Sequence, residues 1–418
     1  METNFLDPLY GQCTLSDAMG QLARSASVQR LREIRQSNID SLDLPGFANT
    51  TRYEHALGTA YLASAVEGAG WLDVSEKMTL EAAALLHDSA ISSYGHLLEE
   101  AFGYSGIPSD HEQRWSWLLS GTDSTLIGGV RSQIYLGRQA ALDSWIAKWG
   151  SSKIAAHSIF ETIRGRGKLG PLVCGSLDLD NLDNVTRAAF HVGLCPDRNL
   201  PLRIAKNIVG LANSHPIYLP ATLIDIQAWL DLRKSLYNKL MFAQQDFTGK
   251  AMLISAAVSA LESGLLKPSH WILTDREFIS LLLSGSQDIA SPVKDWLSGD
   301  LWPFSGILTL KGNAPTLTEL FEIGKQVSET LKRECFAYRI KDKRTRAIVV
   351  NTSDGHTHMM GKESNLWFFG VVSRKKSPFK KRELTVLRQL IEKLVPQSAT
   401  TSDFGCPEIG SFQDPHLI

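Results

Sequence analysis

The stretch EAAALLHDSAISSYGHLLEE, residues 81–100, decides how the chain can be interpreted. It opens as an apolar helical run that stops at His87 and Asp88, and a further histidine, His96, follows nine residues after His87. Neighbouring residues on a helix point about 100° apart, so His87 and Asp88 can reach one ion only near a helix end or with help from other helices. The pair therefore predicts a metal site that distant parts of the chain complete.

Two other residues are candidates to complete this site. His55 lies in the Ala- and Leu-rich segment RYEHALGTAYLA, and Asp180 lies at the start of a helical segment in LDLDNLDN. Two imidazoles and two carboxylates form a mixed nitrogen and oxygen site, which suits a divalent first-row ion and leaves positions open for water and phosphate oxygens. By spacing alone, a histidine on an apolar helix also fits an ordinary core residue.

The composition is that of an ordinary globular protein. Hydrophobic residues make up 43% of the 418 residues and charged residues 21%, and the formal net charge is −1, so no overall field favours nucleic acid or a membrane surface. Five cysteines without a C-x-x-C pair indicate reduced thiols. The chain shows no signal segment and no run of about 20 apolar residues. We therefore expect a cytoplasmic protein without a membrane partner.

Helical patterns dominate the chain up to residue 285. They are expected at residues 15–36, 54–68, 78–87, 109–120, 137–164, 178–192, 200–213 and 221–264, the last as one or two helices. Another helix, at 274–285, has Thr274 as its N-cap and Glu277 at the capping-box spacing.

The character of the sequence changes near residue 305. Short β-like runs follow, namely GILTL, CFAYRI, RAIVVN and LWFFGVV, and a closing helix, LTVLRQLIEKLV. The expected fold class is therefore mainly α, with a helical core at 1–305, a small C-terminal α/β lobe at 306–398 and a flexible tail at 399–418.

Several stretches resemble, in order, the HD-domain phosphohydrolases, and among them the dNTP triphosphohydrolase branch. They are DPLYGQ, VQRLREIRQ with LPGFANTTRYEHALGTAYLA, AALLHDSAISSYGHLLE, HEQRWSWLL, SLDLDNLDNVTRAAFHVG and RKSLYNKLMFAQQDFTGKAMLISAAV, which together cover roughly residues 6–290. The resemblance implies an HD-domain helical core and a phosphohydrolase with one divalent ion, for which Mn, Fe, Mg, Co, Ni and Zn are candidates. It also implies a nucleotide substrate and a homo-oligomer.

The resemblance assigns roles residue by residue. It implies four metal ligands: His55, His87, Asp88 and Asp180. It places His96 and His111 near the scissile phosphate, one of them a candidate proton donor, so that the catalytic candidates are His96, His111 and Asp88. Besides His96 and His111, the substrate-binding candidates are Arg52, Asn181, Asn184, Arg233 and Tyr237, with the two arginines as phosphate contacts.

This chain departs from the family pattern in the part that binds substrate. Ile91 replaces a histidine, Asn181 a lysine, Asn184 a tyrosine, Ala188 an aspartate and Met241 a second tyrosine. In the family these positions contact the triphosphate and the sugar, and lost polar partners change discrimination strongly. Gln29 and Arg32 match residues that contact an activating guanine nucleotide, but Arg24 replaces the acidic residue expected there, so such activation is not expected.

Three other motifs are weaker. GRGKLG, residues 165–170, follows a helix and lacks the strand that a dinucleotide-binding loop needs, although its cations could touch a phosphate. GHTH, with His356 and His358, fits a polar hairpin turn better than a metal pair. The basic run at 373–382 fits an exposed loop, with a nucleotide phosphate or a nucleic-acid backbone as less favoured ligands.

The retained ligand set and the changed substrate positions favour an active phosphohydrolase with an altered substrate. We expect cleavage of a nucleoside triphosphate, deoxy or ribose, to nucleoside and triphosphate. One alternative is a phosphatase or phosphodiesterase acting on a modified or ribose nucleotide. The other is a nucleotide-sensing antiviral or regulatory module with little turnover.

Overall fold

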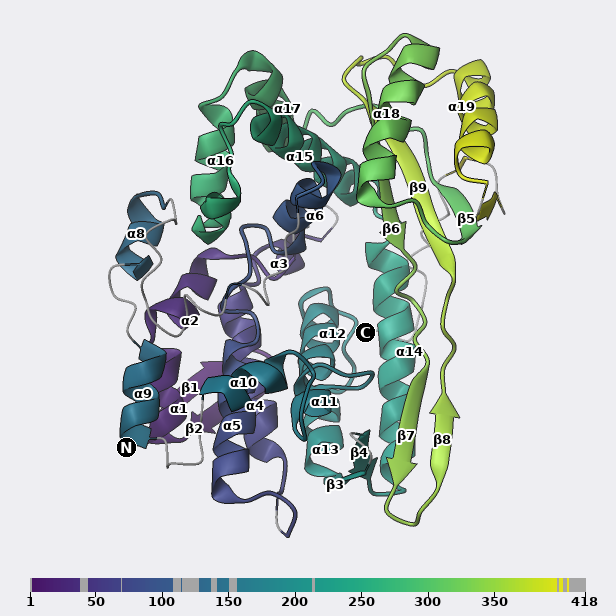
Figure 1. The fold of residues 1–418 in the computed structure, drawn as a ribbon. Coiled ribbons are helices and arrows are strands. Elements are labelled where there is room, and N and C mark those ends of the chain that lie inside the picture. Colours follow the sequence, from purple (N-terminus) through teal and green to yellow (C-terminus); the bar gives the residue numbers. More distant parts are fainter. Residues whose placement is uncertain are drawn as a thin grey trace.

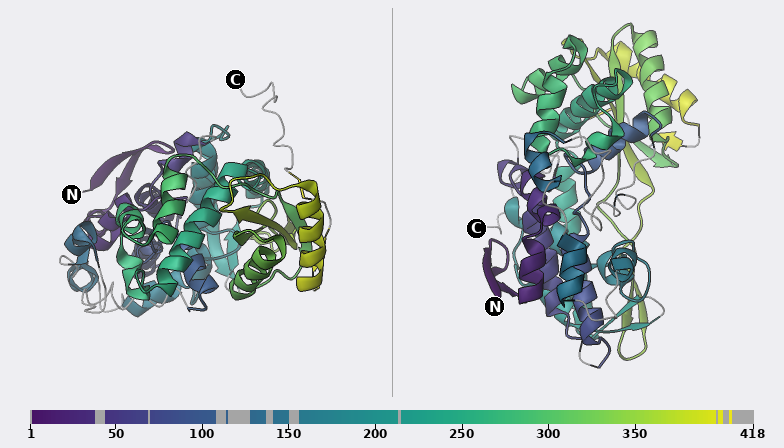
Figure 2. Two further views of the ribbon diagram at one scale, coloured as in Figure 1. Left: turned by 90° about the horizontal axis from the view of Figure 1, so that it is seen from above. Right: turned by 60° about the vertical axis from the view of Figure 1, so that its left-hand side comes forward.

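Two hydrophobic cores, one above the other in Figure 1, organise the structure. The computed structural model describes residues 2–37, 44–68, 70–107, 114, 128–136, 141–149, 156–212, 215–396, 398–400 and 404–405. The right-hand view of Figure 2 separates the lower body, which holds the N-terminal helices, from the upper body, which holds the C-terminal sheet. Among the described residues, no helix is both long enough and apolar enough to cross a lipid bilayer.

The lower body is a group of helices around an apolar centre that includes Leu62, Leu85 and Trp229. Apart from α6, the described helices up to residue 240 are α1 (Asp17–Ala23), α2 (Ala26–Arg30), η1 (Leu31–Glu33), α3 (Pro45–Ala48), α4 (Arg52–Ala65), α5 (Val74–Leu86), α8 (Val130–Leu136), α9 (Ala141–Trp149), α10 (Ala156–Ile163), α11 (Gly170–Val173), α12 (Leu179–His191), α13 (Leu200–Lys206) and α14 (Thr222–Leu240). Helices α4, α5, α12 and α14 are the ones that carry the residues of interest.

Helix α6 (His96–Tyr104) belongs to the upper body, although it follows α5 directly in the chain. Its residues Leu97, Leu98 and Phe102 are part of the upper core, and the Tyr104 hydroxyl donates to the Ala337 carbonyl at 2.9 Å. The later helices are α15 (Gln244–Glu262), η3 (Pro268–Ile272), α16 (Asp275–Leu283), α17 (Gln287–Leu297), α18 (Leu317–Leu331) and α19 (Lys381–Leu394).

Three small sheets complement the helices in the described part of the chain. The strands are β1 (Thr3–Asp7), β2 (Gly11–Leu15), β3 (Ile208–Ala212), β4 (His215–Tyr218), β5 (Leu308–Gly312), β6 (Cys335–Lys341), β7 (Ile348–Thr352), β8 (Thr357–Met360), β9 (Leu366–Ser373) and β10 (Ser398–Thr400). β1 and β2 form an antiparallel pair. The upper sheet has the order β10-β5-β9-β6 and is antiparallel, and the lower sheet has the order β3-β4-β7-β8, with β4 and β7 parallel.

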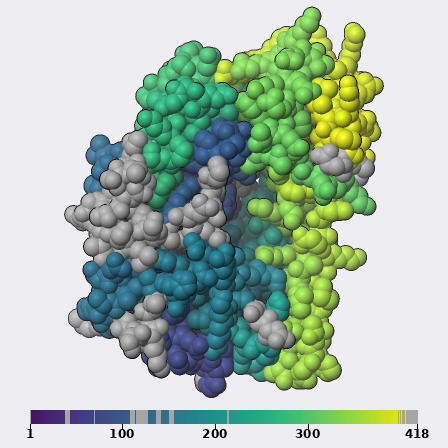
Figure 3. All heavy atoms as spheres, in the orientation of Figure 1, coloured from purple at the N-terminus to yellow at the C-terminus, as the bar shows by residue number. Residues whose placement is uncertain are grey.

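A long two-stranded ribbon connects the two bodies. The β6–β9 pairing reaches Lys341 opposite Trp367 in the upper body, and the β7–β8 pairing starts at Ile348 opposite Met360 in the lower body. The C-terminal part of the chain therefore covers the right-hand side of the molecule over its full height (Figure 3). The domain limits expected at 305/306 and 398/399 stay predictions; Ile348 from the C-terminal part lies in the lower core.

The expected fold class is confirmed, since helices dominate and most of the small strands, β5 to β10, lie in the C-terminal part. Thr274 and Glu277 form the expected capping box at the start of α16. One helix expectation was wrong: the segment 200–213 forms α13 only to Lys206 and continues as β3. The β-branched Ile208 pairs with Tyr218 of β4 there, and Gly210 pairs with Ile217 after a shift in register. This sheet contact outweighs the helical pattern of the preceding residues.

Arg30 of α2 connects the lower body to two chain segments near the junction of the two bodies. It is fully buried, and its guanidinium donates to four backbone carbonyls at 2.8–3.1 Å: those of Ile91, Trp271, Ile272 and Leu273. Because Ile91 lies three residues after Asp88, Arg30 also holds the turn that follows the His-Asp pair.

Replacing Arg30 by methionine should lower the free energy of unfolding by at least about 3 kcal/mol, because each buried carbonyl that loses its donor costs about 1–3 kcal/mol. Urea denaturation followed by circular dichroism would measure the change. The matched control is Arg32→Met, because the exposed Arg32 donates only to the side chain of Gln29. Equal midpoints for the two variants would contradict this role of Arg30.

Candidate metal centre

The ends of three helices bring the histidines and aspartates together. His55 lies in the first turn of α4, whose N-cap is Thr51. His87 is the C-cap of α5, so Asp88 already follows a new backbone direction and can turn toward the same point. Asp180 lies in the first turn of α12, after the N-cap Asp178. His87 and Asp88 can therefore face the same point although they are adjacent, because the helix ends between them.

The candidate ligand atoms lie within a few ångströms of one another. His55 Nε2 is 3.1 Å from His87 Nε2 and 2.9 Å from Asp180 Oδ1, and His87 Nε2 is 3.5 Å from Asp88 Oδ2. The ligand atoms of His55, His87 and Asp88 all lie within 4.8 Å of one another. Ligands about 2.0–2.2 Å from a common ion are separated by about 3–4 Å, so these spacings fit one divalent ion. Asp180 is close enough to serve as a fourth ligand.

Hydrogen bonds fix the orientation of both imidazole rings. His55 Nδ1 is 2.7 Å from Asp183 Oδ1, and His87 Nδ1 is 2.8 Å from the Ala84 carbonyl. Both acceptors require the proton on Nδ1, which leaves Nε2 with its lone pair toward the centre. The two rings thus present the same nitrogen to the same point, as metal-binding histidines do.

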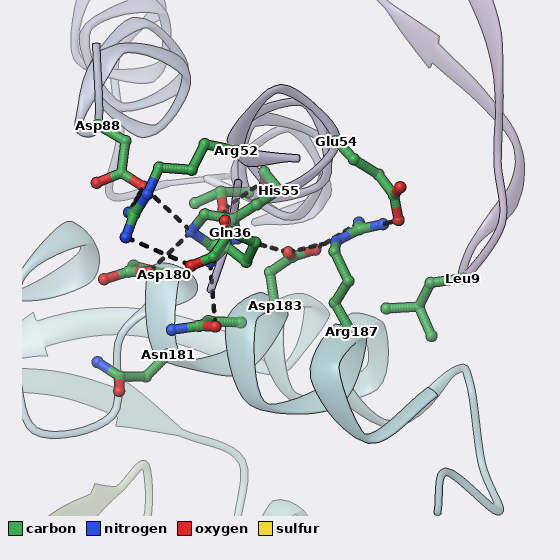
Figure 4. A network of polar contacts seen from close by, with 12 residues as sticks. Leu9, Gln36, Arg52, Glu54, His55, Asp88, Asp180, Asn181, Asp183 and Arg187 are labelled. Atoms are coloured by element: carbon green, nitrogen blue, oxygen red, sulfur yellow. Dashed lines mark hydrogen bonds and ion pairs between the residues drawn. The ribbon is translucent and has the colours of Figure 1, made fainter. Parts of the chain in front are cut away.

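A buried charge network holds Asp183 in place, as Figure 4 shows. Arg187 donates from Nε and Nη2 to the two carboxylate oxygens of Asp183, at 2.8 and 2.9 Å. It also donates to Glu54 at 2.6 Å and to Asp7 of β1 at 3.2 Å. Burial alone would raise the pKa of Asp183, but Arg187 and His55 hold that pKa below its usual value. Asp183 is therefore a carboxylate when it accepts from His55.

Arg52 lies beside the cluster and contacts Asp88 directly (Figure 4). Its Nη1 donates to Asp88 Oδ2, and its Nη2 lies 3.5 Å from the Gln36 carbonyl. Burial opposes ionisation of Asp88, yet the charge of Arg52 keeps the pKa of Asp88 below its usual value. Gly95 makes room for Arg52: its φ is +60°, and a Cβ there would meet Arg52 Nη2 at 2.7 Å.

The remaining predicted site residues take different places. The His96 side chain, at the start of α6, is 60% exposed, and its Nδ1 lies 2.9 Å from Glu99, so it is not part of the metal cluster. Asn181 turns back to bond both oxygens of Asp178, and Asn184 accepts from Gln36 at 3.1 Å. His111 falls outside the described residues.

Arg233 and Tyr237 are neighbours on α14, with the Arg233 guanidinium 4.6 Å from the centre of the Tyr237 ring. Two of the positions that depart from the family pattern hold apolar residues: Ile91 is fully buried in the lower core, and Met241 packs with Ile307 and Phe368. Neither side chain has a charged or hydroxyl group that could form a hydrogen bond with a substrate.

Sequence inspection did not single out Asp183, Arg187 or Gln36. A signal for the first two was present, because Asp180, Asp183 and Arg187 are spaced i, i+3 and i+7 and share one face of α12. Gln36 gave no local signal. It approaches the site because its backbone N–H donates to the Thr50 carbonyl at 2.9 Å and the Arg52 N–H donates to the Ile34 carbonyl at 2.9 Å.

Ion pairs occupy some of the cations in two of the motifs judged weaker in the sequence. In GRGKLG, Lys168 bonds both carboxylate oxygens of Glu76, at 2.7 and 2.8 Å. In the basic run at 373–382, Arg374 pairs with Asp288 and Glu334, and Lys376 pairs with Asp295 and Asp300. A nucleic-acid contact stays a prediction.

The fold has a counterpart among solved structures. The crystal structure of a phosphohydrolase from Bacteroides thetaiotaomicron superposes with a TM-score of 0.63, at 17% sequence identity, over 89% of this chain and 100% of that chain. No family model matches the sequence. Together with the sequence relatives described next, this fold relates the chain to the HD-domain phosphohydrolases, at low identity.

Three relatives bear on the kind of protein. Deoxynucleoside triphosphate triphosphohydrolase SAMHD1 of Danio rerio is 23% identical over 217 residues, 46% of this chain and 34% of that protein. Metal-dependent phosphohydrolase cns2 of Cordyceps militaris is 24% identical over 290 residues, 66% of this chain and 72% of that protein. An uncharacterized protein of Methanocaldococcus jannaschii is 27% identical over 187 residues, 45% of this chain and 33% of that protein. The matched region thus spans about a third of the length of the Danio rerio and Methanocaldococcus jannaschii relatives.

Replacing His87 by alanine should leave the purified protein without a stoichiometric divalent ion, because three ligands then remain and one of them, Asp180, is partly exposed. Inductively coupled plasma mass spectrometry would measure the metal content. The control is His356→Ala, an exposed histidine of the β7–β8 hairpin, which should keep the wild-type content. A His87→Ala protein with full metal content would exclude this cluster as the metal centre.

Replacing Asp183 by asparagine should weaken metal affinity by about 10–100-fold, as loss of an outer hydrogen-bond partner commonly does. The amide no longer stabilises the Nδ1–H form of His55 as a carboxylate does. Competition with a chelating dye would measure the affinity, and circular dichroism would show that the variant is folded. An unchanged affinity would mean that the orientation of His55 does not depend on Asp183; Asp354→Asn, at an exposed residue, is the control.

Proposed function

We propose that this protein is a metal-dependent phosphohydrolase that acts on a nucleotide. The single observation that carries the proposal is the convergence of His55 Nε2, His87 Nε2 and carboxylate oxygens of Asp88 and Asp180 beside the Arg52 guanidinium. The names of two relatives, a dNTP triphosphohydrolase and a metal-dependent phosphohydrolase, support the same class of reaction.

The donor set fits one divalent ion held by His55, His87, Asp88 and Asp180. When bound, such an ion supplies a Lewis acid for a phosphoryl oxygen and lowers the pKa of a water molecule. The protein side chains account for the other requirements. Asp88 holds Arg52 through Nη1, while Nη2 lies near the Gln36 carbonyl. The guanidinium can therefore offset charge on a phosphoryl group next to the cluster.

His96 is the described candidate for giving a proton to the leaving group. It is exposed and lies at the start of α6, eight residues after Asp88, so a proton that it gives up can be replaced from solvent. Its partner Glu99, with Oε2 2.9 Å from Nδ1, fixes the orientation of the ring. His111 remains a second candidate for this role.

We infer hydrolysis of a nucleoside triphosphate to nucleoside and triphosphate as the preferred reaction. The apolar replacements Ile91 and Met241 and the engagement of Asn181 with Asp178 argue against an ordinary dNTP as the preferred substrate. A modified or ribose nucleotide, or a monoester or diester of one, is the alternative that these residues favour. A homo-oligomer, with Mn, Fe, Mg, Co, Ni or Zn as the ion, completes the proposal.

The direct test incubates metal-free protein with each of these ions and a panel of NTPs, dNTPs, monophosphates and cyclic nucleotides, with products separated by chromatography. Released triphosphate is the expected product, and Asp88→Ala should reduce the rate by more than about 100-fold, beyond what loss of an outer partner costs. Asp354→Ala, at an exposed carboxylate, should keep the wild-type rate. If phosphate or nucleoside monophosphate is the product, the protein is a phosphatase or phosphodiesterase and not a triphosphohydrolase.

Absence of turnover with every ion, together with tight nucleotide binding, would instead identify a nucleotide sensor. Full activity of Asp88→Ala would contradict the metal-dependent mechanism altogether.

A further inference from the structure

Asp275 connects the upper body to two segments that border the metal centre. It lies in the first turn of α16, a helix that packs in the upper core through Phe278, and it is 4% exposed. Its Oδ1 accepts from the backbone N–H of Tyr94 at 2.7 Å, and its Oδ2 accepts from the backbone N–H of Arg35 at 2.9 Å. One buried carboxyl group therefore holds two backbone segments that are distant from each other in the sequence.

The first segment is the turn that leads from the His-Asp pair to α6. Tyr94 has φ +53°, in the left-handed region that residues other than glycine rarely adopt, and Gly95 follows with φ +60°. A turn with this backbone needs partners that stabilise it, and Asp275 is one of them, through the Tyr94 N–H. His96 comes directly after the turn, so the hold on Tyr94 also determines where the His96 side chain begins.

The second segment contains Arg35 and Gln36. The Gln36 carbonyl lies 3.5 Å from Arg52 Nη2. The turn reaches the same nitrogen, because a Cβ at Gly95 would lie 2.7 Å from Arg52 Nη2. Both segments that Asp275 holds therefore border one nitrogen of the Arg52 guanidinium, the group that the proposed function places beside a substrate phosphate.

Other hydrogen bonds attach the turn to the chain just before α16. Ser93 Oγ donates to the Leu273 carbonyl at 2.6 Å, and Arg30 donates to the carbonyls of Ile91 and Leu273 at 2.8 and 3.1 Å. These contacts place the turn against the upper body. Asp275 adds to them by reaching the second segment as well, so it sets the distance between the two segments.

We propose that Asp275 is a positioning residue of the candidate metal centre. It holds the two segments at the separation at which Arg52 and His96 both face one substrate phosphate. It acts through its two backbone contacts and not by contact with the substrate. The inference rests on the proposed phosphohydrolase function for the reaction, whereas the hold on the two segments is a property of the fold.

Replacing Asp275 by asparagine tests the proposal in the full-length protein. The amide has one acceptor oxygen, and its NH2 group meets the other backbone N–H as a second donor, so one segment is released. A displacement of about 1 Å can cost about 100-fold in rate, so kcat for a nucleoside triphosphate should fall by about 10–100-fold while KM changes much less. Metal content should stay at the wild-type level, because the hydrogen bonds that orient His55 and His87 do not involve Asp275.

A second measurement does not depend on turnover. Hydrogen–deuterium exchange of the metal-free protein, followed by mass spectrometry, reports on the peptides that contain Tyr94 and Arg35. In Asp275→Asn, at least one of these peptides should exchange about 10-fold faster, as loss of one hydrogen bond to a carboxyl group implies. Asp275→Ser places a smaller side chain in the same space, should show the same losses, and replaces Asp275→Asn in both measurements if that variant does not fold.

The matched control is Asp246→Asn. Asp246 lies in the first turn of α15, another helix of the upper core, is also 4% exposed, and pairs with Lys250 of its own helix at 2.6 Å. The control therefore loses a carboxylate of equal burial without releasing either segment. It should keep the wild-type kcat and the wild-type exchange of the Tyr94 peptide.

Wild-type kcat in Asp275→Asn would overturn the proposal even if exchange is faster, because Asp275 would then serve the fold alone. An equal loss of kcat in Asp275→Asn and Asp246→Asn would overturn it as well. Wild-type protein that hydrolyses no nucleotide would contradict the proposed function. Faster exchange in Asp275→Asn would then still support the hold on the two segments, and unchanged exchange would overturn it.

Discussion

The hydrogen bond between His55 Nδ1 and Asp183 is the interaction on which the rest of the site depends. It fixes the proton on Nδ1 and directs Nε2 to the point where His87 and Asp180 also arrive. Asp183 can hold this position only as a carboxylate, and in a fully buried place a carboxylate needs a compensating cation. Arg187 provides it through two bonds. A strand at the N-terminus then takes part, because Asp7 of β1 shares Arg187 with Asp183.

The same principle distinguishes the arginines of the protein from one another. Arg187 has carboxylates on several sides, and Arg30 has four carbonyls, so both are satisfied and serve the fold. Arg52 is paired with Asp88 but leaves Nε without a partner, and Arg233 has neither a paired carboxylate nor partners for two of its nitrogens among the described residues. Cations that the fold leaves unsatisfied are the ones that anionic ligands need.

The sequence allowed the centre of the site to be anticipated, and the structure shows why its surroundings could not be. His87 and Asp88 are adjacent, and the resemblance brought His55 and Asp180 to them; the structure places all four together. Asp183 and Arg187 could have been predicted only by considering one face of α12 as a whole. The role of Asp275 could not be foreseen, because its contact with Tyr94 joins positions 181 residues apart and depends on how α16 packs. The β3 strand was missed because it pairs with the neighbouring β4, which in turn pairs with the distant β7, and local periodicity does not encode that sheet.

The placement of α6 in the upper core has a consequence for how divisible this molecule is. The candidate metal ligands all come from the lower body, yet His96 is carried by a helix that packs on residues 335–338 and 317–318 of the C-terminal part. A fragment ending before residue 306 would keep every candidate ligand and lose the surface that holds α6, as well as Ile348 and Val350 of the lower core. The segments that look like an appendage in the sequence thus support α6 and complete part of the lower core, so the C-terminal part is not a separable module.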